Sequence, residues 1–254
     1  MGFSIKLNAM KRNIVILITI LFIFSNYARA QESYIGFSLG TSIPGGDFAA
    51  AEHLFNNGYA IPGFTVSFEG YYFPLRFIGI GGVLGFGSLY AESDNYLDDL
   101  IEYAYTQPGI PVFGSPPLAD DIGFESGFWN YINLMAGPEL SVPFGRFRAG
   151  IRGLAGLTLA FYPKREFYYS EGSNILEINV NGPSAAFTYS YGASLLYKSR
   201  AGTGIKVSAD YLSSKASYDF NMEVITSANE YNHTRREDVD LEALSITLGF
   251  FYVF

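Results

Sequence analysis

The chain ends in the stretch LEALSITLGFFYVF, residues 241–254, and this stretch decides the fold. Its even positions carry large apolar side chains: Leu244, Ile246, Leu248, Phe250, Tyr252 and Phe254. Several odd positions between them hold small or polar residues, as at Ser245, Thr247 and Gly249. Because successive side chains of a β-strand point to opposite faces, this alternation predicts a strand with one apolar and one small or polar face.

The same alternation recurs along the chain and predicts eight strands. The predicted strands are residues 34–43, 61–71, 77–90, 129–142, 147–161, 185–197, 204–212 and 241–254. In each of them apolar side chains share one face, and glycine, serine, threonine and a few charged residues share the other.

The connections between these strands alternate between short and long. The short ones are residues 72–75, 143–145 and 199–202, and the long ones are 44–59, 91–128, 163–183 and 214–238. Transmembrane β-barrels have short periplasmic turns and longer extracellular loops. The pattern therefore predicts an antiparallel up-and-down transmembrane barrel of eight strands, with ten strands as the main alternative.

The composition favours lipid rather than water around this barrel. Of the 254 residues, 49% are hydrophobic and only 16% are charged, whereas a soluble domain carries about 25% charge. The small faces hold few lysines and glutamates, which a water-facing surface would carry, and their glycines make room inside a narrow barrel. We therefore expect the apolar faces to contact membrane lipid.

Composition also excludes several classes of protein. Without cysteine the chain cannot form a disulfide framework or a thiolate metal site. Its net charge of −8 argues against nucleic acid as a partner, because phosphate backbones attract basic surfaces. No cofactor and no metal site is predicted.

Residues 1–30 are predicted to be a secretory signal peptide, and residues 31–254 the barrel domain. A basic start that ends at Arg12 precedes the apolar run 14–24, and residues 28–30, Ala-Arg-Ala, supply the small residues of a cleavage site. The apolar run is shorter than the roughly 18 residues that a spanning helix needs. Removal of four basic residues and no acidic one changes the net charge from −8 to −12.

With its signal peptide, alternating strands and carboxy-terminal aromatic residue, the chain resembles the bacterial outer-membrane β-barrel family, in particular its small eight-stranded members. Residues 137–139, Gly-Pro-Glu, are similar to a step in a middle strand of that family. The resemblance implies a location in the cell outer membrane, contact with its lipid, and a structural or cell-surface binding role. It also implies that Phe250, Tyr252 and Phe254 form a signal for the barrel assembly machinery. It implies no reaction.

Six charged residues fall on the small, inward faces: Glu69, Glu139, Arg148, Arg152, Lys206 and Asp210. Three of each sign are expected to neutralise one another in an interior ion-pair network. A two-residue turn at Pro143-Phe144 would place Glu139 opposite Arg148. Because an eight-stranded barrel is just wide enough for side chains to fill, we expect a plugged interior. A narrow channel for small solutes is the alternative.

An enzymatic alternative depends on histidine. Small outer-membrane barrels that modify lipid A use a histidine with serine or aspartate near the outer rim, and His53 with Asp47 or Ser42 is the comparable group here. His233 is the second of the two histidines, and no nucleophile motif lies beside either. We expect both histidines to be solvated and predict no catalytic residue.

The long connection 91–128 is acidic. It contains Glu92, Asp94, Asp98, Asp99, Glu102, Asp120, Asp121 and Glu125 and no lysine or arginine. The spacing lacks the D-x-[DN]-x-[DN]-G pattern of a calcium loop. A solvated acidic loop is expected, and cation binding stays open.

Two other long connections are partly strand-like. Ile178 and Val180 alternate with polar neighbours, as do Tyr218 and Phe220, which predicts hairpins that stand above the membrane. Their exposed edges could bind an extracellular ligand or protein by strand addition. The apolar positions change from odd at Tyr211 to even at Tyr218, so we expect a bulge or a break between them.

The carboxy-terminal aromatic residue gives a first prediction. Deletion of Phe254 should lower the amount of heat-modifiable, membrane-inserted barrel, because the last strand would lose part of its assembly signal. Export across the inner membrane should not change, and cell fractionation with gel mobility before and after heating measures both. Normal insertion without Phe254 would contradict the role of this residue.

Overall fold

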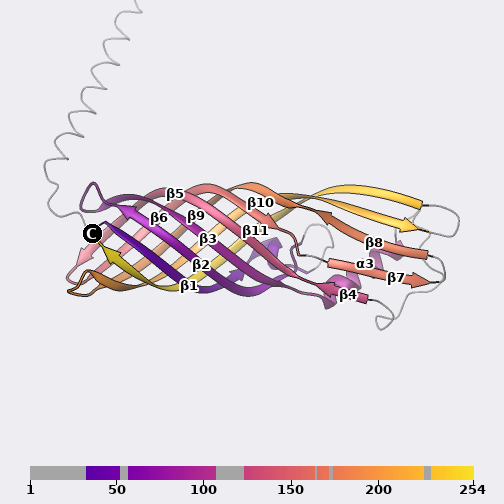
Figure 1. The fold of residues 1–254 in the computed structure, drawn as a ribbon, viewed down its shortest axis with the longest axis horizontal. Coiled ribbons are helices and arrows are strands. Elements are labelled where there is room, and N and C mark those ends of the chain that lie inside the picture. The colour runs from indigo at the N-terminus through magenta and orange to yellow at the C-terminus, as the bar shows by residue number, and fades with distance from the viewer. Residues whose placement is uncertain (1–32, 52–56, 107–122, 164, 172–173, 226–229) are drawn as a thin grey trace, which may run out of the picture.

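The computed structural model describes residues 33–51, 57–106, 123–163, 165–171, 174–225 and 230–254. The signal peptide predicted for residues 1–30 lies outside this part of the chain. The described residues form a long barrel that continues at one end into a narrower sheet (Figure 1). The short turns between strands and the carboxyl end lie at the other end of the barrel. We call this the inner end, and the end that continues into the narrower sheet the outer end.

Eight antiparallel strands form the barrel wall, in the ring order β1-β2-β3-β5-β6-β9-β10-β11. Their bounds are β1 (Tyr34–Pro44), β2 (Ala60–Tyr72), β3 (Ile78–Ala91), β5 (Phe128–Phe144), β6 (Phe147–Phe161), β9 (Pro183–Lys198), β10 (Thr203–Ile225) and β11 (Glu230–Val253). Because β11 pairs with both β10 and β1, the ring is closed. The prediction of eight strands is confirmed, and the alternative of ten is wrong.

The first and last strands close the barrel. Their register runs from Tyr34 opposite Val253 to Pro44 opposite Ala243, and the Phe254 N–H donates a further hydrogen bond to the Ser33 carbonyl oxygen (2.9 Å). Hydrocarbon offers no hydrogen-bond partner to a free sheet edge, so a strand sheet can span a membrane only when closed.

The turn between β5 and β6 corrects the predicted register. Phe144 pairs with Phe147, so the turn residues are Gly145 and Arg146, and Glu139 lies opposite Arg152 instead of Arg148. Gly145 has φ of +67°, as the first central residue of a type II′ hairpin turn requires. The prediction of a turn at Pro143-Phe144 is wrong because the proline ring fixes φ near −65°.

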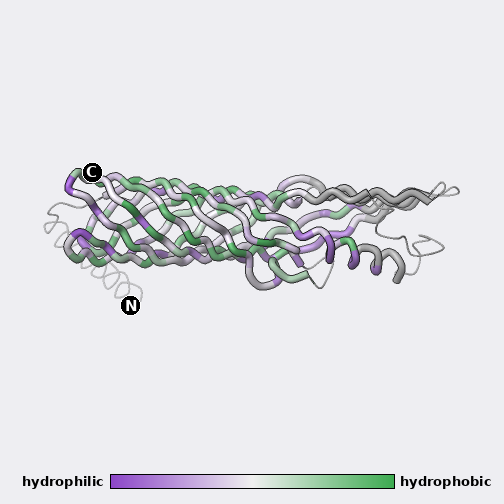
Figure 2. The backbone as a smooth tube through the Cα atoms, turned by 90° about the horizontal axis from the view of Figure 1, so that it is seen from below, coloured by the Kyte–Doolittle hydropathy of each residue, from purple (hydrophilic) through white to green (hydrophobic). Residues whose placement is uncertain are grey.

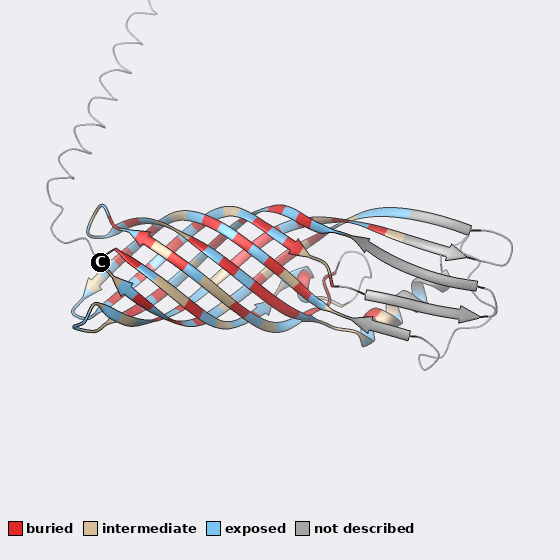
Figure 3. Cartoon of the chain, viewed as in Figure 1, coloured by how far each residue is buried: buried red, intermediate tan, exposed pale blue. Residues whose placement is uncertain are grey.

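Burial alternates along the barrel strands (Figure 3). On β5, Leu134 is 66% exposed and the next residue, Met135, 5%. The exposed positions are largely apolar and give the outer surface a hydrophobic belt. Figure 2 shows hydrophobic and hydrophilic residues interspersed along the barrel strands. A water-soluble surface does not expose apolar area on this scale. The apolar face therefore points to lipid, as the composition predicted.

Aromatic side chains border this belt at both ends. Exposed rings near the inner turns are Tyr72, Phe77, Phe144, Phe147, Tyr197, Tyr252 and Phe254. Exposed rings near the outer end are Tyr90, Phe128, Phe187 and Tyr189. Such girdles mark the two membrane interfaces of outer-membrane barrels.

Beyond the barrel, β10 and β11 continue as a hairpin that three short strands extend. These strands are β8 (Asn174–Asn181), β7 (Arg165–Glu171) and β4 (Gly123–Ser126), in the order β10-β8-β7-β4. The predicted outer hairpins are therefore present. The helices at this end are α2 (Gly46–Ala49) and α3 (Asp94–Thr106), and within the described residues no helix is long and apolar enough to cross a membrane.

The bulge or break predicted between Tyr211 and Tyr218 is absent. The β10–β11 register is continuous from Thr203 opposite Tyr252 to Ile225 opposite Glu230. The surroundings of the strand change instead. On β11 the outward side chains change from charged ones such as Asp240 to apolar ones from Leu244 onward.

The inward side chains of β11 change in the opposite sense at the same level. Val239, Leu241 and Ala243 are buried apolar residues, whereas Ser245 and Thr247 face the barrel interior. The outer surface thus meets lipid below this level and water above it. The parity change in the sequence marks the membrane boundary rather than a bulge.

Buried aromatic rings close the outer mouth of the barrel. The aromatic cap consists of Phe48, Trp129, Tyr162, Tyr218 and Phe220, with ring centroids 4.7–5.9 Å apart in contacting pairs. The Trp129 Nε1–H donates a hydrogen bond to the Gly58 carbonyl oxygen (2.7 Å), which fixes the indole in place. Phe48 comes from α2, so this short helix brings a side chain over the barrel opening.

Truncation of this cap should weaken the folded barrel. We expect Trp129→Ala to lower the free energy of unfolding by about 3–5 kcal/mol, because it leaves a cavity among buried rings. Trp129→Phe keeps a ring but leaves the Gly58 oxygen without its donor, which costs about 1–3 kcal/mol. Urea unfolding of the refolded barrel, followed by circular dichroism, measures both values. Equal stability of the alanine variant and the wild type would contradict a stabilising role of the aromatic cap.

Candidate functional site

The barrel interior contains a chain of ion pairs with Arg152 at its centre. Its Nε and Nη2 donate to the two carboxylate oxygens of Asp210, at 2.7 and 2.6 Å. Its Nη1 donates to Oε2 of Glu69. This guanidinium therefore joins carboxylates from two strands, β2 and β10, to its own strand, β6.

Lys206 completes the chain through its Nζ, which binds Oε1 of Glu69. The side chains of Glu69 and Lys206 are each 1% exposed. Buried charges are tolerated when they are paired and hydrogen-bonded. Asp210, Arg152, Glu69 and Lys206 carry two charges of each sign and satisfy this condition.

The remaining two predicted residues, Glu139 and Arg148, also face the interior. Glu139 Oε2 accepts a hydrogen bond from the Tyr34 hydroxyl (3.0 Å), and Oε1 has no hydrogen-bond partner among the described residues. The Arg148 guanidinium lies over the Phe73 ring, 4.6 Å from its centroid. All six residues predicted from the sequence thus line the inner half of the barrel, and four of them form one chain of ion pairs.

Two tyrosines belong to this network although the sequence analysis did not single them out. Tyr34 and Tyr71 stack at 5.4 Å, and Arg152 Nη1 lies 3.5 Å from the Tyr71 hydroxyl. Tyr71 follows Glu69 by two residues, so it shares the inward face. Strand parity was the signal that could have identified it.

Small residues make room for the charged side chains. At Gly192 an added Cβ would lie 1.9 Å from Asp210 Oδ1. A larger residue on β9 would therefore displace the carboxylate that Arg152 binds. This close approach is the kind of space that the sequence predicted glycine to provide inside a narrow barrel.

A cavity of about 40 Å³ lies between the ion pairs and the outer half of the barrel. Its lining combines polar residues such as Arg152, Asp210, Tyr131 and Thr247 with apolar ones such as Met135 and Leu154. A polar cavity of this size holds a few water molecules. The aromatic cap lies between this cavity and the outer solvent.

The residues of the enzymatic alternative do not form a rim site in the described structure. Ser42 is fully buried inside the barrel, and its Oγ lies 3.2 Å from the Tyr131 hydroxyl. Asp47 is exposed on α2. His53 lies outside the described residues, and His233 lies opposite Met222 in the outer hairpin. The grouping of His53 with Asp47 or Ser42 stays a prediction, because His53 lies outside the described residues.

The acidic connection contains a helix. Asp94, Asp98 and Glu102 occupy α3 at four-residue steps, and all three are exposed. Among the described residues, no group of three metal-ligating side chains is placed to hold an ion.

The outer sheet has a charged, partly unpaired edge. β1 pairs with β11 only as far as Ala243, so among the described strands residues 230–241 of β11 pair with β10 alone. Asp238 accepts a hydrogen bond from Ser217 (2.6 Å) and lies 3.6 Å from Lys215 Nζ. The hydrogen bond from Ser217, helped by Lys215, lowers the pKa of the Asp238 carboxyl and keeps it ionised.

The central arginine gives a prediction about stability. We expect Arg152→Met to cost about 3–5 kcal/mol of unfolding free energy, because the half-buried Asp210 carboxylate loses its partner and the buried Glu69 carboxylate loses one of two. Lys215→Met is the matched control, since its ion pairs are exposed and worth less than about 1 kcal/mol. A second change, Asp210→Asn, should restore part of the loss in Arg152→Met. Urea unfolding measures the free energy of unfolding of each variant. Equal losses for Arg152→Met and Lys215→Met would contradict a stabilising role of the interior ion pairs.

No protein-family model and no curated protein matches the chain. Among solved structures, the chain is similar to a major outer membrane protein of Thermus thermophilus, with 10% identity over 89% of this chain and 100% of that chain and a TM-score of 0.44. The outer membrane protease OmpT of Escherichia coli has 11% identity over 89% and 99%, with a TM-score of 0.44. The attachment invasion locus protein Ail of Yersinia pestis has 13% identity over 87% and 97%, with a TM-score of 0.34.

These likenesses concern the fold alone. The identification depends on the structure itself, in which a closed ring of eight strands carries an apolar belt outside and paired charges inside. By these features the chain is an eight-stranded transmembrane β-barrel protein.

Proposed function

We propose that the barrel is a closed membrane anchor and that the outer sheet is a platform for binding at the cell surface. The observation that carries this proposal is the continuous β10–β11 ladder, which leaves the barrel wall and runs to Ile225 opposite Glu230. Strands β8, β7 and β4 widen this ladder into a five-stranded sheet.

The filled interior supports the anchor role. The ion pairs around Arg152 occupy the inner half of the barrel, and the aromatic cap occupies the outer mouth. The described cavity between them has a volume of about 40 Å³, which is room for a few water molecules. A narrow channel for small solutes has no comparable support.

The construction of the outer sheet supports the binding role. The hairpin is continuous with two strands of the barrel, so its position is fixed relative to the membrane. The edge of β11 offers backbone groups to a partner strand, which is a common mode of peptide recognition. Charged side chains on this edge, such as Arg236 and Asp238, oppose unspecific pairing between sheets.

Shortening the hairpin tests this role while preserving the cap. In the variant, residues 222–233 are replaced by Asn-Gly, so Tyr218 and Phe220 are retained. Cells that produce the intact chain should adhere to one or more of a panel of immobilised extracellular proteins, and the shortened chain should lower this adherence at least tenfold. Heat-modifiable mobility on gels checks that both chains form the barrel.

Two outcomes would contradict the proposal. The first is equal adherence of cells with the intact and shortened chains, which would separate binding from the outer sheet. The second is steady conductance steps in planar bilayers that contain the refolded protein, which would show an open pore.

A further inference from the structure

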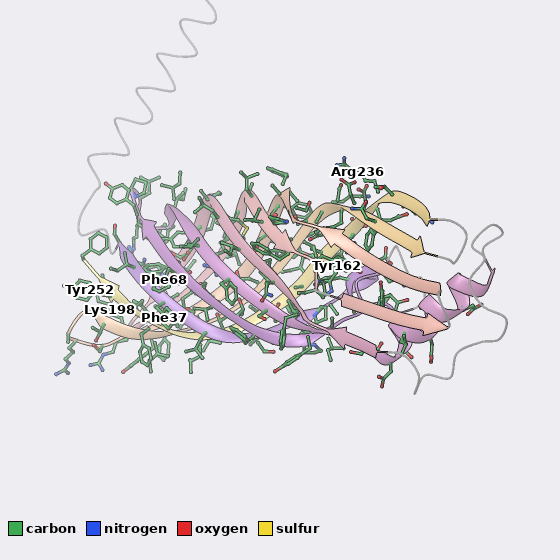
Figure 4. All side chains as sticks on the ribbon, turned by 45° about the vertical axis from the view of Figure 1, so that its right-hand side comes forward. Phe37, Phe68, Tyr162, Lys198, Arg236 and Tyr252 are labelled. Carbon is green, nitrogen blue, oxygen red and sulfur yellow. The ribbon has the colours of Figure 1, made fainter. Side chains whose placement is uncertain are left out.

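The inner end of the barrel carries basic residues. Arg76 lies in the β2–β3 turn, Arg146 in the β5–β6 turn, and Lys198 and Arg200 at the β9–β10 turn. None of these three turns contains an acidic side chain. The outer end differs, since α3 alone contains Asp94, Asp98, Asp99 and Glu102. In Figure 4 Lys198 and Tyr252 lie at the inner end, and Arg236 lies at the outer end.

Three of these basic residues, Arg146, Lys198 and Arg200, lie in or beside two neighbouring turns of the barrel. The Lys198 backbone N–H donates to the Arg146 carbonyl oxygen (2.8 Å), so the β5–β6 turn lies directly beside the end of β9. Arg200 follows in the next turn and is exposed.

The aromatic girdle sets the depth of this basic patch of Arg146, Lys198 and Arg200. Phe147 and Tyr197 are exposed on the outer surface with ring centroids 5.1 Å apart, and each directly adjoins a residue of the patch. Aromatic rings of outer-membrane barrels lie at the membrane interface. The patch therefore lies at the level of the lipid headgroups of the periplasmic leaflet.

A cavity of about 40 Å³ opens beside the patch at the inner mouth of the barrel. Arg146, Arg148 and Lys198 line it together with Tyr34 and Phe251, and no carboxylate side chain belongs to its lining. The cavity therefore offers cationic donors and a little space to an oxyanion.

From this placement we infer that Arg146, Lys198 and Arg200 bind the phosphate group of an anionic phospholipid in the periplasmic leaflet. Guanidinium and ammonium groups form charge-assisted hydrogen bonds with phosphate oxygens. The acyl chains of the same lipid would lie against the apolar outer surface beside the patch, at Phe147, Tyr197 and Leu195. A free phosphate ion would gain nothing from that surface.

The test uses the refolded full-length barrel, labelled with ¹⁵N, in zwitterionic micelles. Three probes are titrated separately: dihexanoyl phosphatidylglycerol, dihexanoyl phosphatidylcholine and inorganic phosphate. Phosphatidylglycerol should shift the amide signals of residues 145–147 and 198–202 in a saturable manner. The choline lipid and inorganic phosphate should leave these signals unchanged.

Two double variants with the same change in net charge separate the patch from general electrostatics. Arg146→Gln with Lys198→Gln should weaken binding of phosphatidylglycerol about 25-fold, since each basic residue near an anionic lipid surface contributes about fivefold. Lys215→Gln with Arg236→Gln, at the outer end, should leave the affinity unchanged. Heat-modifiable gel mobility checks that both variants fold.

Several outcomes would overturn the inference. If phosphatidylglycerol causes no shift, or phosphatidylcholine causes the same shift, the patch does not select anionic lipid. If inorganic phosphate saturates the same amides, the patch is a free-anion site. If both double variants bind equally weakly, overall charge rather than the patch determines binding.

Discussion

The pairing of β1 with β11 is the contact on which the rest of this structure depends. Without it, two strand edges would face hydrocarbon, where a backbone N–H or carbonyl group finds no partner. The pairing joins residues 34–44 to residues 243–253, so it forms only after β11 has been made. The last strand therefore both completes the ring and carries the aromatic residues of the expected assembly signal, which are exposed to lipid.

Closure of eight strands in turn restricts the interior. A ring of this size leaves room for side chains but not for an open channel. Buried charges are tolerated there when they are paired, as in the chain from Asp210 through Arg152 and Glu69 to Lys206. Small residues such as Gly192 supply the space that the long side chains need. Stability and closure of the interior are therefore consequences of the same packing.

The change from lipid to water along the barrel axis explains how one sheet serves two environments. Below the boundary the apolar side chains of β11 point outward to lipid, and above it they point inward to the aromatic cap. The strands cross this level without a register shift between β10 and β11. A hairpin fixed in the membrane can therefore continue into water as a sheet with its own apolar core. The proposed binding platform depends on this continuity, whereas the proposed lipid site depends on the opposite rim.

The alternation of side chains determined the strands and which charged residues share the small faces, because period two is a local property of extended backbone. The composition of the two faces decided which of them meets lipid. Strand parity could also have identified Tyr34 and Tyr71. Other features depended on contacts between distant residues. The partners of Arg152 come from β2 and β10. The β5–β6 register is set locally instead, by the turn at Gly145, whose positive φ suits glycine and excludes Pro143 from that position. The parity change after Tyr211 was visible in the sequence, but only the continuous ladder decided that it marks a change of solvent, since both a bulge and a boundary invert the pattern.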